Sequence, residues 1–152
     1  MPPGYNHPAR VAERIATLDL ISDGRVEFGT GESSAALELA GYGVEVGRKR
    51  EMWAEATEQC ANMMVMDPYP GFEGQFFSMP TRNVVPKPLQ TPHPPIWVAC
   101  SKRETIHMAA RAGIGALNFA FINPADAVKR VDEYYDIINS EACVPIVHAV
   151  NA

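Results

Sequence analysis

A short strand and a glycine-containing loop follow one another in Arg25-Val26-Glu27-Phe28-Gly29-Thr30-Gly31-Glu32-Ser33-Ser34. Val26 and Phe28 alternate with charged residues, which is the spacing of a strand with one buried face. The two glycines then let the main chain adopt conformations, and approach a ligand, in ways that a side chain would prevent. The stretch predicts a strand over 25–29 and a binding loop at 30–34, although taken alone a plain glycine turn explains it better.

The composition is that of one globular domain over residues 1–152. The chain has 152 residues, of which 47% are hydrophobic and 20% charged, so it can bury a core. A net charge of −5 argues against a nucleic-acid partner, which needs a basic surface. No apolar run approaches the roughly 20 residues that span a membrane, and the first residues lack the features of a secretory signal.

The cysteines and prolines add two further expectations. The three cysteines are widely spaced and form no C-x-x-C pair, which favours reduced thiols in a cytoplasmic protein over a disulfide framework or a zinc site. No metal site is predicted elsewhere either. Eight of the thirteen prolines lie between Pro68 and Pro95, so residues 68–95 are predicted to form one long irregular insertion.

Two long helices are predicted in the first half of the chain. The first begins at His7-Pro8, where proline at the first helical position costs no hydrogen bond, and ends at Ser22-Asp23-Gly24. The second runs from Arg48 to about Met66, with the apolar stripe Met52, Trp53, Ala56, Cys60, Met63 and Met64. Between the 30–34 loop and Gly47 the sequence is glycine-rich and polar, and no element is predicted there.

The second half alternates strands with helices. Residues 75–79 and 82–85 are predicted to pair as a hairpin, and the apolar run 96–100 is typical of a strand buried on both faces. Ser101 with Glu104 forms the pattern of a capping box, which predicts a helix that ends at Gly113. The remaining predicted elements are a strand over 115–121, a helix from Asn123-Pro124 with Val128, Val131, Tyr135 and Ile138 on one face, and a last strand over 144–150.

This order predicts an α/β fold with about four parallel strands and intervening helices. Four strands cannot close a barrel, and the chain begins on a helix and stops on a strand of the buried type. We therefore expect a segment of a larger parallel α/β assembly, which alone would be poorly folded or a homo-oligomer.

Ligands of parallel α/β folds gather at the carboxyl ends of the strands, which here are the loops 30–34, 101–104, 122–124 and 151–152. The second of these begins a helix, whose N–H groups and positive dipole end suit a phosphate. Ser101 would add a hydroxyl, and Lys102 and Arg103 would add positive charge. The alternative, that Ser101 and Glu104 simply cap each other, is favoured by the residues alone.

No catalytic nucleophile is evident, because the chain has neither a G-x-S-x-G elbow nor a P-loop. Cys100 could be a reactive thiol at the end of its strand, but a buried structural cysteine is the better interpretation. Three histidines, His93, His107 and His148, are also predicted to be structural.

Four segments carry a family resemblance: residues 7–31 (HPARVAERIATLDLISDGRVEFGTG), 83–90 (NVVPKPLQ), 92–99 (PHPPIWVA) and 109–115 (AARAGIG). In this order they resemble the luciferase-like flavin-dependent monooxygenases, from about residue 7 to the end of the chain. The resemblance implies a partial (β/α)8 TIM barrel, from its third helix to its seventh strand. The Pro-rich hairpin excursion at 68–95 then corresponds to the family's insertion before the fifth strand.

The resemblance also implies a cofactor, reduced FMN or, in some branches, the deazaflavin F420. The loop at 30–34 would lie beside the flavin and its ribityl chain, and the loop at 100–105 would hold the phosphate. The cofactor-binding residues implied are Thr30, Gly31, Glu32, Ser33, Cys100, Ser101, Lys102, Arg103 and Thr105. Glu32 stands where the luciferases have a basic residue that reaches the phosphate, which departs from the family pattern.

By resemblance the protein is an FMN-dependent monooxygenase that uses reduced FMN and O2 on an organic substrate, with a flavin reductase as a partner. The family's first three strands, which carry substrate-pocket and catalytic residues, are missing, so catalytic residues are not assigned and the fragment is expected to be inactive. Two alternatives stay open. One is an F420-dependent dehydrogenase on the same fold, and the other is a non-catalytic partial barrel that only binds flavin or a partner chain.

Overall fold

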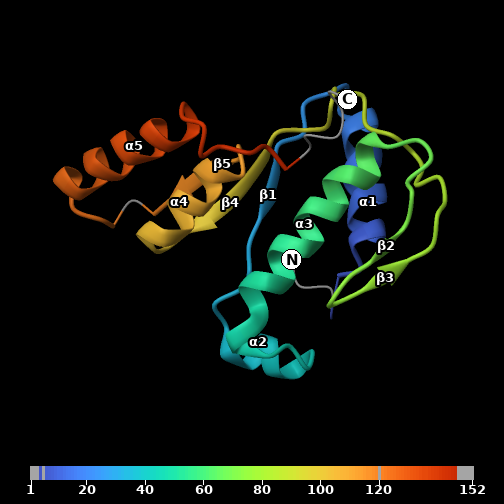
Figure 1. Ribbon diagram of the computed structural model, residues 1–152, viewed down its shortest axis with the longest axis horizontal. Helices are drawn as coiled ribbons and strands as arrows, with labels where there is room; N and C mark the ends of the chain where they lie inside the picture. The colour runs from blue at the N-terminus through green and yellow to red at the C-terminus, as the bar shows by residue number, and fades with distance from the viewer. Residues whose placement is uncertain (1–3, 5, 120, 147–152) are drawn as a thin grey trace. The chain divides into compact units, whose positions relative to one another are not determined.

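The computed structural model describes residue 4, residues 6–119 and residues 121–146 (Figure 1). The contacts divide the chain into two compact units. The first comprises residues up to Val26 together with Gly31–Pro94, and the second comprises Glu27–Thr30 together with the residues from Pro95 onward. The single domain over residues 1–152 stays a prediction.

Two helices form the centre of the first unit: α1 (Pro8–Ile21) and α3 (Lys49–Val65), which lie side by side in Figure 1. Both confirm the sequence prediction to within one residue. The helix α1 begins at His7, whose Nδ1 accepts a hydrogen bond from the N–H of Ala9 at 3.2 Å. The residues buried in the two helices are mostly small, which allows close packing: Ala12, Ala16, Ala56, Cys60 and Ala61.

The polar segment before α3, for which the sequence predicted no element, is partly helical. It contains the helix α2 (Ala36–Gly41) and the single 3₁₀ turn η1 (Val46–Arg48). Leu39 and Val44 are almost fully buried, which supplies the packing that holds so short a helix. Six residues carry too little periodicity to be recognised in a glycine-rich sequence.

The insertion at 68–95 contains a hairpin, but a different one from that predicted. The strands β2 (Phe72–Glu73) and β3 (Ser78–Met79) pair antiparallel, with Phe72 opposite Met79. Tyr69 and Arg82 add one further antiparallel bridge. The turn therefore falls at residues 74–77, most of which belong to the predicted strand 75–79.

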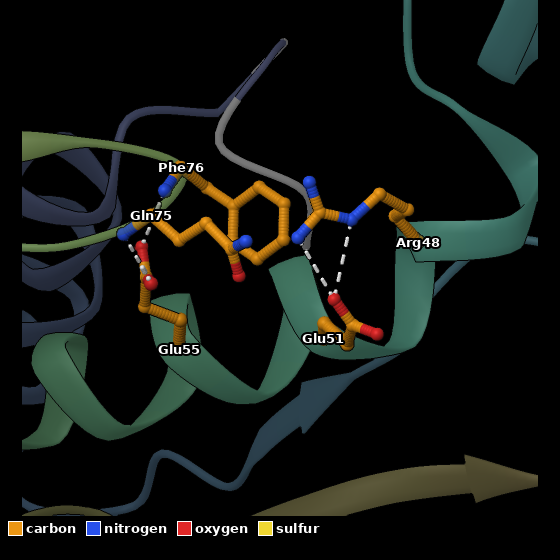
Figure 2. Close-up of polar contacts among 5 residues, drawn as sticks. All are labelled: Arg48, Glu51, Glu55, Gln75 and Phe76. Atoms are coloured by element: carbon orange, nitrogen blue, oxygen red, sulfur yellow. Dashed lines mark hydrogen bonds and ion pairs between the residues drawn. The ribbon is translucent and has the colours of Figure 1, made fainter.

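The turn of this hairpin is held by α3 (Figure 2). The Glu55 carboxylate accepts hydrogen bonds from the N–H groups of Gln75 at 2.8 Å and Phe76 at 3.0 Å. The Arg48 guanidinium lies over the Phe76 ring, 4.5 Å from its centroid, and also donates to Glu51. A side chain 20 positions earlier in the chain therefore binds the hairpin at its turn.

The second unit is built on a parallel sheet in the order β1-β4-β5. The strand β4 (Ile96–Cys100) lies at its centre, with β1 (Phe28–Thr30) on one side and β5 (Gly115–Asn118) on the other. The parallel pairing of the first strand with residues 96–100 confirms the expectation from the sequence. Most of the fourth predicted strand, 144–150, lies outside the described residues.

Two strands are shorter than predicted. The first begins at Phe28 instead of residue 25, because side chains take the backbone groups of Val26: its N–H donates to Asp19 at 3.4 Å and its carbonyl accepts from Gln90 at 2.9 Å. The strand β5 ends at Asn118 instead of residue 121, and the rings of Phe119 and Phe121 stack on each other beyond it.

The helices α4 (Arg103–Arg111) and α5 (Pro124–Ile138) pack against each other, and α4 also packs on β4 and β5. As predicted, α4 is followed by Gly113 in a left-handed conformation, with φ of 66°. As predicted, α5 begins at Asn123-Pro124, and the Asn123 side chain accepts from the N–H of Ala125. The predicted apolar face of α5 is largely exposed, at 60% for Val128 and 58% for Tyr135.

Candidate functional site

The parallel register places the carboxyl ends of the three strands at one edge of the sheet. Thr30 ends β1, Cys100 ends β4 and Asn118 ends β5, with Cys100 directly opposite Asn118. Ligands of parallel α/β folds bind at this edge. The structure thus brings two of the predicted site residues, Thr30 and Cys100, to neighbouring strand ends.

The side chains of both residues form hydrogen bonds within the sheet. The Thr30 hydroxyl donates to the carbonyl of Trp97 at 2.8 Å, so it tightens the β1–β4 pair. The Cys100 thiol is 1% exposed and donates to the carbonyl of Val98 at 3.3 Å. Burial raises the pKa of Cys100 to about 11, against a smaller lowering by a hydrogen bond with the backbone of Leu117. This is the environment of a structural thiol, not of a nucleophile.

The segment after Thr30 belongs to the first unit and is fixed by several contacts. Ser33 has φ of 63°, and its hydroxyl donates to the Glu38 carboxylate at 2.5 Å. The N–H of Ala35 in turn donates to the Ser33 hydroxyl at 3.3 Å. The Lys49 ammonium donates to the Ser33 carbonyl at 2.5 Å, which ties the loop to the first residue of α3. The loop is therefore held in one conformation from both sides.

Glu32 is the unusual member of this loop. Its Oε1 lies 3.6 Å from an Nη atom of Arg50, within an ion pair. Its Oε2 is buried and has no hydrogen-bond partner among the residues that the structure describes. Sequence reasoning missed both Lys49 and Arg50 as neighbours of the loop, although the basic run 48–50 at the start of a helix was a visible signal.

The loop after β4 differs from the sequence prediction in how the helix begins. Lys102, not Ser101, is the residue that precedes the first helical residue, and no side chain caps α4. The predicted capping box of Ser101 and Glu104 is therefore wrong. Ser101 lies one residue too early to reach the helical N–H groups, and all four residues 101–104 are exposed. The Ser101 hydroxyl is thus not used to cap the helix.

Inside α4, Thr105 is 3% exposed, and its N–H donates to the carbonyl of Lys102 at 3.1 Å. This bond closes the first turn of the helix. Within the described part of the chain, no ion pair involves Lys102. The first helical N–H groups and the Lys102 ammonium are therefore the groups of this loop that could hold an anion.

The Arg103 side chain is directed to a partner on α5. Its guanidinium binds both carboxylate oxygens of Glu133, with one bond of 2.6 Å from Nε to Oε2. His107 contributes a further hydrogen bond from its Nε2 to Glu133 Oε2 at 2.9 Å. The hydrogen bonds from Arg103 and then from His107 lower the pKa of Glu133 to about 2. Sequence reasoning gave no signal for this pair, which joins residues 30 positions apart.

Within the described residues, the other histidines do not take part in a metal site. The His93 ring lies 2.8 Å from the carbonyl of Pro94, before β4 begins, and His148 lies outside the described residues. Among the described residues, no group of three histidine, cysteine or acidic side chains is arranged to hold a metal ion. In the same part of the chain, none of the helices has the length and apolar character that crossing a bilayer requires.

The described segments 31–33 and 101–105 belong to different units. That the two form one cofactor site stays a prediction.

Comparison with known proteins gives both uncharacterised relatives and a relative with an assigned activity. An uncharacterised protein of Sinorhizobium fredii is 31% identical over 134 residues, which cover 86% of this chain and 37% of that protein. The oxygenase component of a flavin-dependent trigonelline monooxygenase of Acinetobacter baylyi is 29% identical over 111 residues, covering 70% of this chain and 30% of the relative. The chain thus spans about a third of the length of these curated relatives.

Solved structures show the same fold. A monooxygenase of Streptomyces bottropensis matches with a TM-score of 0.83 and 28% identity, over 95% of this chain and 44% of that one. Two others share the fold at lower identity: an FMN-bound type II Baeyer-Villiger monooxygenase of Pseudomonas putida (TM-score 0.77, 18%, covering 93% and 42%) and an F420-dependent secondary alcohol dehydrogenase (TM-score 0.75, 21%, covering 93% and 44%). The predicted fold class, an α/β partial TIM barrel, is confirmed.

The family comparison agrees with these matches. The family described as luciferase-like monooxygenase matches residues 1–141, which is most of the chain. The resemblance inferred from residues 7–31, 83–90, 92–99 and 109–115 is thereby confirmed. The chain belongs to the luciferase-like monooxygenase family.

Proposed function

We propose that this chain supplies one side of the cofactor site of a flavin-dependent monooxygenase that uses reduced FMN and O2 on a small organic substrate. The observation that carries the proposal is the shared edge of the parallel sheet, where β4 leads into an α4 whose start has no side-chain cap. A helix that begins in this way offers N–H groups to an anion, and FMN ends in a phosphate.

The residues present suit a flavin mononucleotide. At the phosphate end we assign the N–H groups of Ser101, Lys102 and Arg103, the Ser101 hydroxyl and the Lys102 ammonium. Arg103 would contribute through its backbone, because its guanidinium is held by Glu133. Thr105 lies within the same helical turn. The negative charge of Glu104 would repel the phosphate, but Glu104 is exposed, so water screens this charge.

The loop at 30–33 would lie along the ribityl chain and the ring system. Gly31 allows close approach of the main chain, since a Cβ built there would meet no atom within 4 Å. Thr30 would shape the site through its bond to Trp97 instead of contacting the cofactor with its hydroxyl. Glu32 would stand in the same loop, where its Oε2 is buried and has no hydrogen-bond partner among the described residues.

In this assignment, bound reduced FMN supplies the electrons that activate O2. The described residues bind and orient the cofactor and help to exclude water from it. None of them is assigned a proton-transfer step, because the buried Cys100 and the paired His107 both serve the packing of the second unit. A flavin reductase as partner, a homo-oligomeric assembly and a cytoplasmic location belong to the same proposal.

Titration of the 152-residue chain with FMN, riboflavin and F420, followed by cofactor fluorescence, tests the proposal. We expect FMN to bind more tightly than riboflavin, because riboflavin lacks the phosphate. Lys102→Ala should weaken FMN binding by roughly fivefold and leave riboflavin binding unchanged. Lys129→Ala, an exposed lysine on α5, is the matched control and should change neither affinity.

Equal affinities for FMN and riboflavin would contradict the phosphate assignment. Binding of F420 without FMN would favour an F420-dependent dehydrogenase, a reading that the fold shared with such an enzyme supports. Oxygen consumption with NADH, a flavin reductase and candidate substrates then separates a monooxygenase from a partial barrel that binds flavin without catalysis.

A further inference from the structure

The first unit contains a cavity of about 390 Å³ between the start of α1 and the chain around the end of β3. Part of its lining is apolar, since Ala9, Met79 and Val84 are each at most 7% exposed. A volume of this size lies at the lower end of the range, roughly 300–1,000 Å³, of pockets that bind small organic molecules. The rest of the lining is mostly polar and comes from both segments: His7, Arg10, Glu13, Ser78, Arg82 and Asn83.

The cavity carries an unbalanced positive charge on a chain whose net charge is −5. The Arg10 guanidinium forms an ion pair with Glu13 at 2.5 Å, so these two charges largely cancel. No hydrogen bond or ion pair involves the Arg82 side chain within the part of the chain that the structure describes. Because a guanidinium is always protonated in proteins, the cavity offers this one cation to a ligand.

The backbone of Arg82 is held in place independently of any ligand. Its N–H donates to the carbonyl of Tyr69, and its carbonyl accepts from the N–H of Tyr69, both at 3.1 Å. Tyr69 is 1% exposed, and its hydroxyl donates to Gln59 at 2.8 Å. A ligand therefore has to order only the Arg82 side chain, which lowers the entropy cost of binding.

Neutral hydrogen-bond donors line the same cavity. The Nδ1 atom of His7 accepts from the N–H of Ala9 at 3.2 Å, so the hydrogen of the neutral ring is on Nε2, which is a donor. The His7 ring also packs edge to face with Phe77, with 5.7 Å between the centroids, and this contact holds its orientation. The Ser78 hydroxyl and the Asn83 amide have no hydrogen-bond partner among the described residues. An anion in the cavity is thus offered a guanidinium together with neutral donors.

The chemistry of the lining limits the class of ligand. A guanidinium binds a planar carboxylate group through two parallel hydrogen bonds. It binds a phosphate as well, but Glu13 would repel a dianionic phosphate more strongly than a monoanionic carboxylate. An inorganic anion would leave the apolar part of the lining without a partner, whereas a hydrocarbon body gains free energy by covering it.

We infer that this cavity binds a small organic carboxylate, whose carboxylate group pairs with Arg82 and whose apolar body lies against Ala9, Met79 and Val84. All of the lining residues belong to the first unit. None of them is among the residues proposed above to hold the flavin, so the inference does not depend on the cofactor assignment.

Three ligands test the two halves of this recognition: benzoate, benzamide, which has the same ring without the charge, and acetate, which has the charge without the ring. Dissociation constants are measured by NMR titration of the isotope-labelled 152-residue chain, followed at the amide signals of Ala9, Asn83 and Val84. We expect saturable shifts at these amides. Benzoate should bind roughly tenfold more tightly than either of the other two ligands.

Arg82→Ala should weaken benzoate binding by roughly tenfold and leave benzamide binding nearly unchanged, because only the carboxylate needs the guanidinium. The matched control is Arg14→Ala, which removes an exposed arginine of α1 that does not line the cavity and should change none of the affinities. Arg82→Lys keeps the charge without the planar fork, so its affinity for benzoate should lie between those of the parent chain and the alanine variant. It decides the question if the alanine variant melts at a lower temperature than the parent chain.

Three results would overturn the inference. Shifts that do not saturate, or that spread over amides outside the cavity, would mean non-specific binding. Equal losses of benzoate affinity in Arg82→Ala and Arg14→Ala would mean that the ligand responds only to the overall charge. Displacement of bound benzoate by an equal concentration of inorganic phosphate would assign the cavity to phosphate groups instead of carboxylates. The proposed function is tested separately, by the flavin titrations.

Discussion

The Asp19 carboxylate accepts two hydrogen bonds from Gln90, a residue that lies 71 positions later in the chain. The backbone N–H of Gln90 donates to Oδ2 at 2.8 Å, and its side-chain amide donates to Oδ1 at 2.7 Å. The N–H of Leu89 adds a third bond at 2.9 Å. Asp19 is fully buried, so this cluster anchors the end of the proline-rich insertion to the last turns of α1.

Replacing this carboxylate should destabilise the first unit. In Asp19→Asn, the new amide cannot accept from all the N–H groups that now surround the side chain, and buried donors lose their partner. We expect a loss of about 2–4 kcal/mol in the free energy of unfolding, measured by urea denaturation. Asp23→Asn, an exposed change nearby, is the control, because asparagine also tolerates its φ of 57°.

The same residue predicts an acid dependence of stability. Burial raises the pKa of Asp19, but hydrogen bonds from Gln90, Val26 and Leu89 outweigh it, so the pKa lies below the ordinary value of 3.8. Because the folded-state pKa is the lower one, this stabilisation is present above pH 3.8 and is lost as the pH falls through the folded-state pKa. The unfolding free energy of Asp19→Asn should fall less steeply than that of the parent chain over this range. Equal slopes would contradict the prediction.

The contact of Glu55 with the hairpin turn predicts a local change in dynamics. Glu55→Gln keeps the size of the side chain but replaces a carboxylate that accepts from two N–H groups (Figure 2). Amide hydrogen exchange at Gln75 and Phe76 should become roughly tenfold faster, with little change in the interior of α3. Glu58→Gln, an exposed change on the same helix, leaves both bonds intact and should leave exchange at these two amides unchanged.

The sequence was informative where structure is decided locally. The helix α1 was predicted correctly because proline at its start and a glycine after its end act on their immediate neighbours. The strand β4 was predicted correctly because its five residues form one apolar run. The position of the sheet edge followed from the alternation of strands and helices.

The sequence predictions were wrong where a side chain that is distant in sequence forms hydrogen bonds with backbone groups. Asp19 and Gln90 take the polar groups of Val26 and delay the start of β1. In the candidate site, the sequence shows which residue types follow Cys100. It does not show that the Arg103 guanidinium binds Glu133. Spacing along one segment carries no information about such partners.

The pair of Arg103 and Glu133 predicts a change that NMR can follow. With Arg103 replaced by alanine, Glu133 loses the main cause of its lowered pKa and keeps only the bond from His107. The pKa of Glu133 should therefore rise from about 2 toward its ordinary value of 4.5. Carboxyl chemical shifts followed over pH give this pKa directly, and an unchanged value would show that the pair does not persist in solution.

The three thiols should differ in their rates of alkylation. Burial raises the pKa of Cys60 to about 12. Burial is also the main reason that the pKa of Cys100 is raised to about 11. Cys143, in contrast, is only half-buried. Because the thiolate is the reactive form, iodoacetamide at pH 8 should modify Cys143 first and the other two only after local or global opening. Mass spectrometry of the peptides over time measures all three rates in one experiment, with the chain in 8 M urea as the control in which they converge. Fast modification of Cys100 in the folded chain would contradict its assignment as a structural thiol, since β4 would then have to open often enough to expose its last residue.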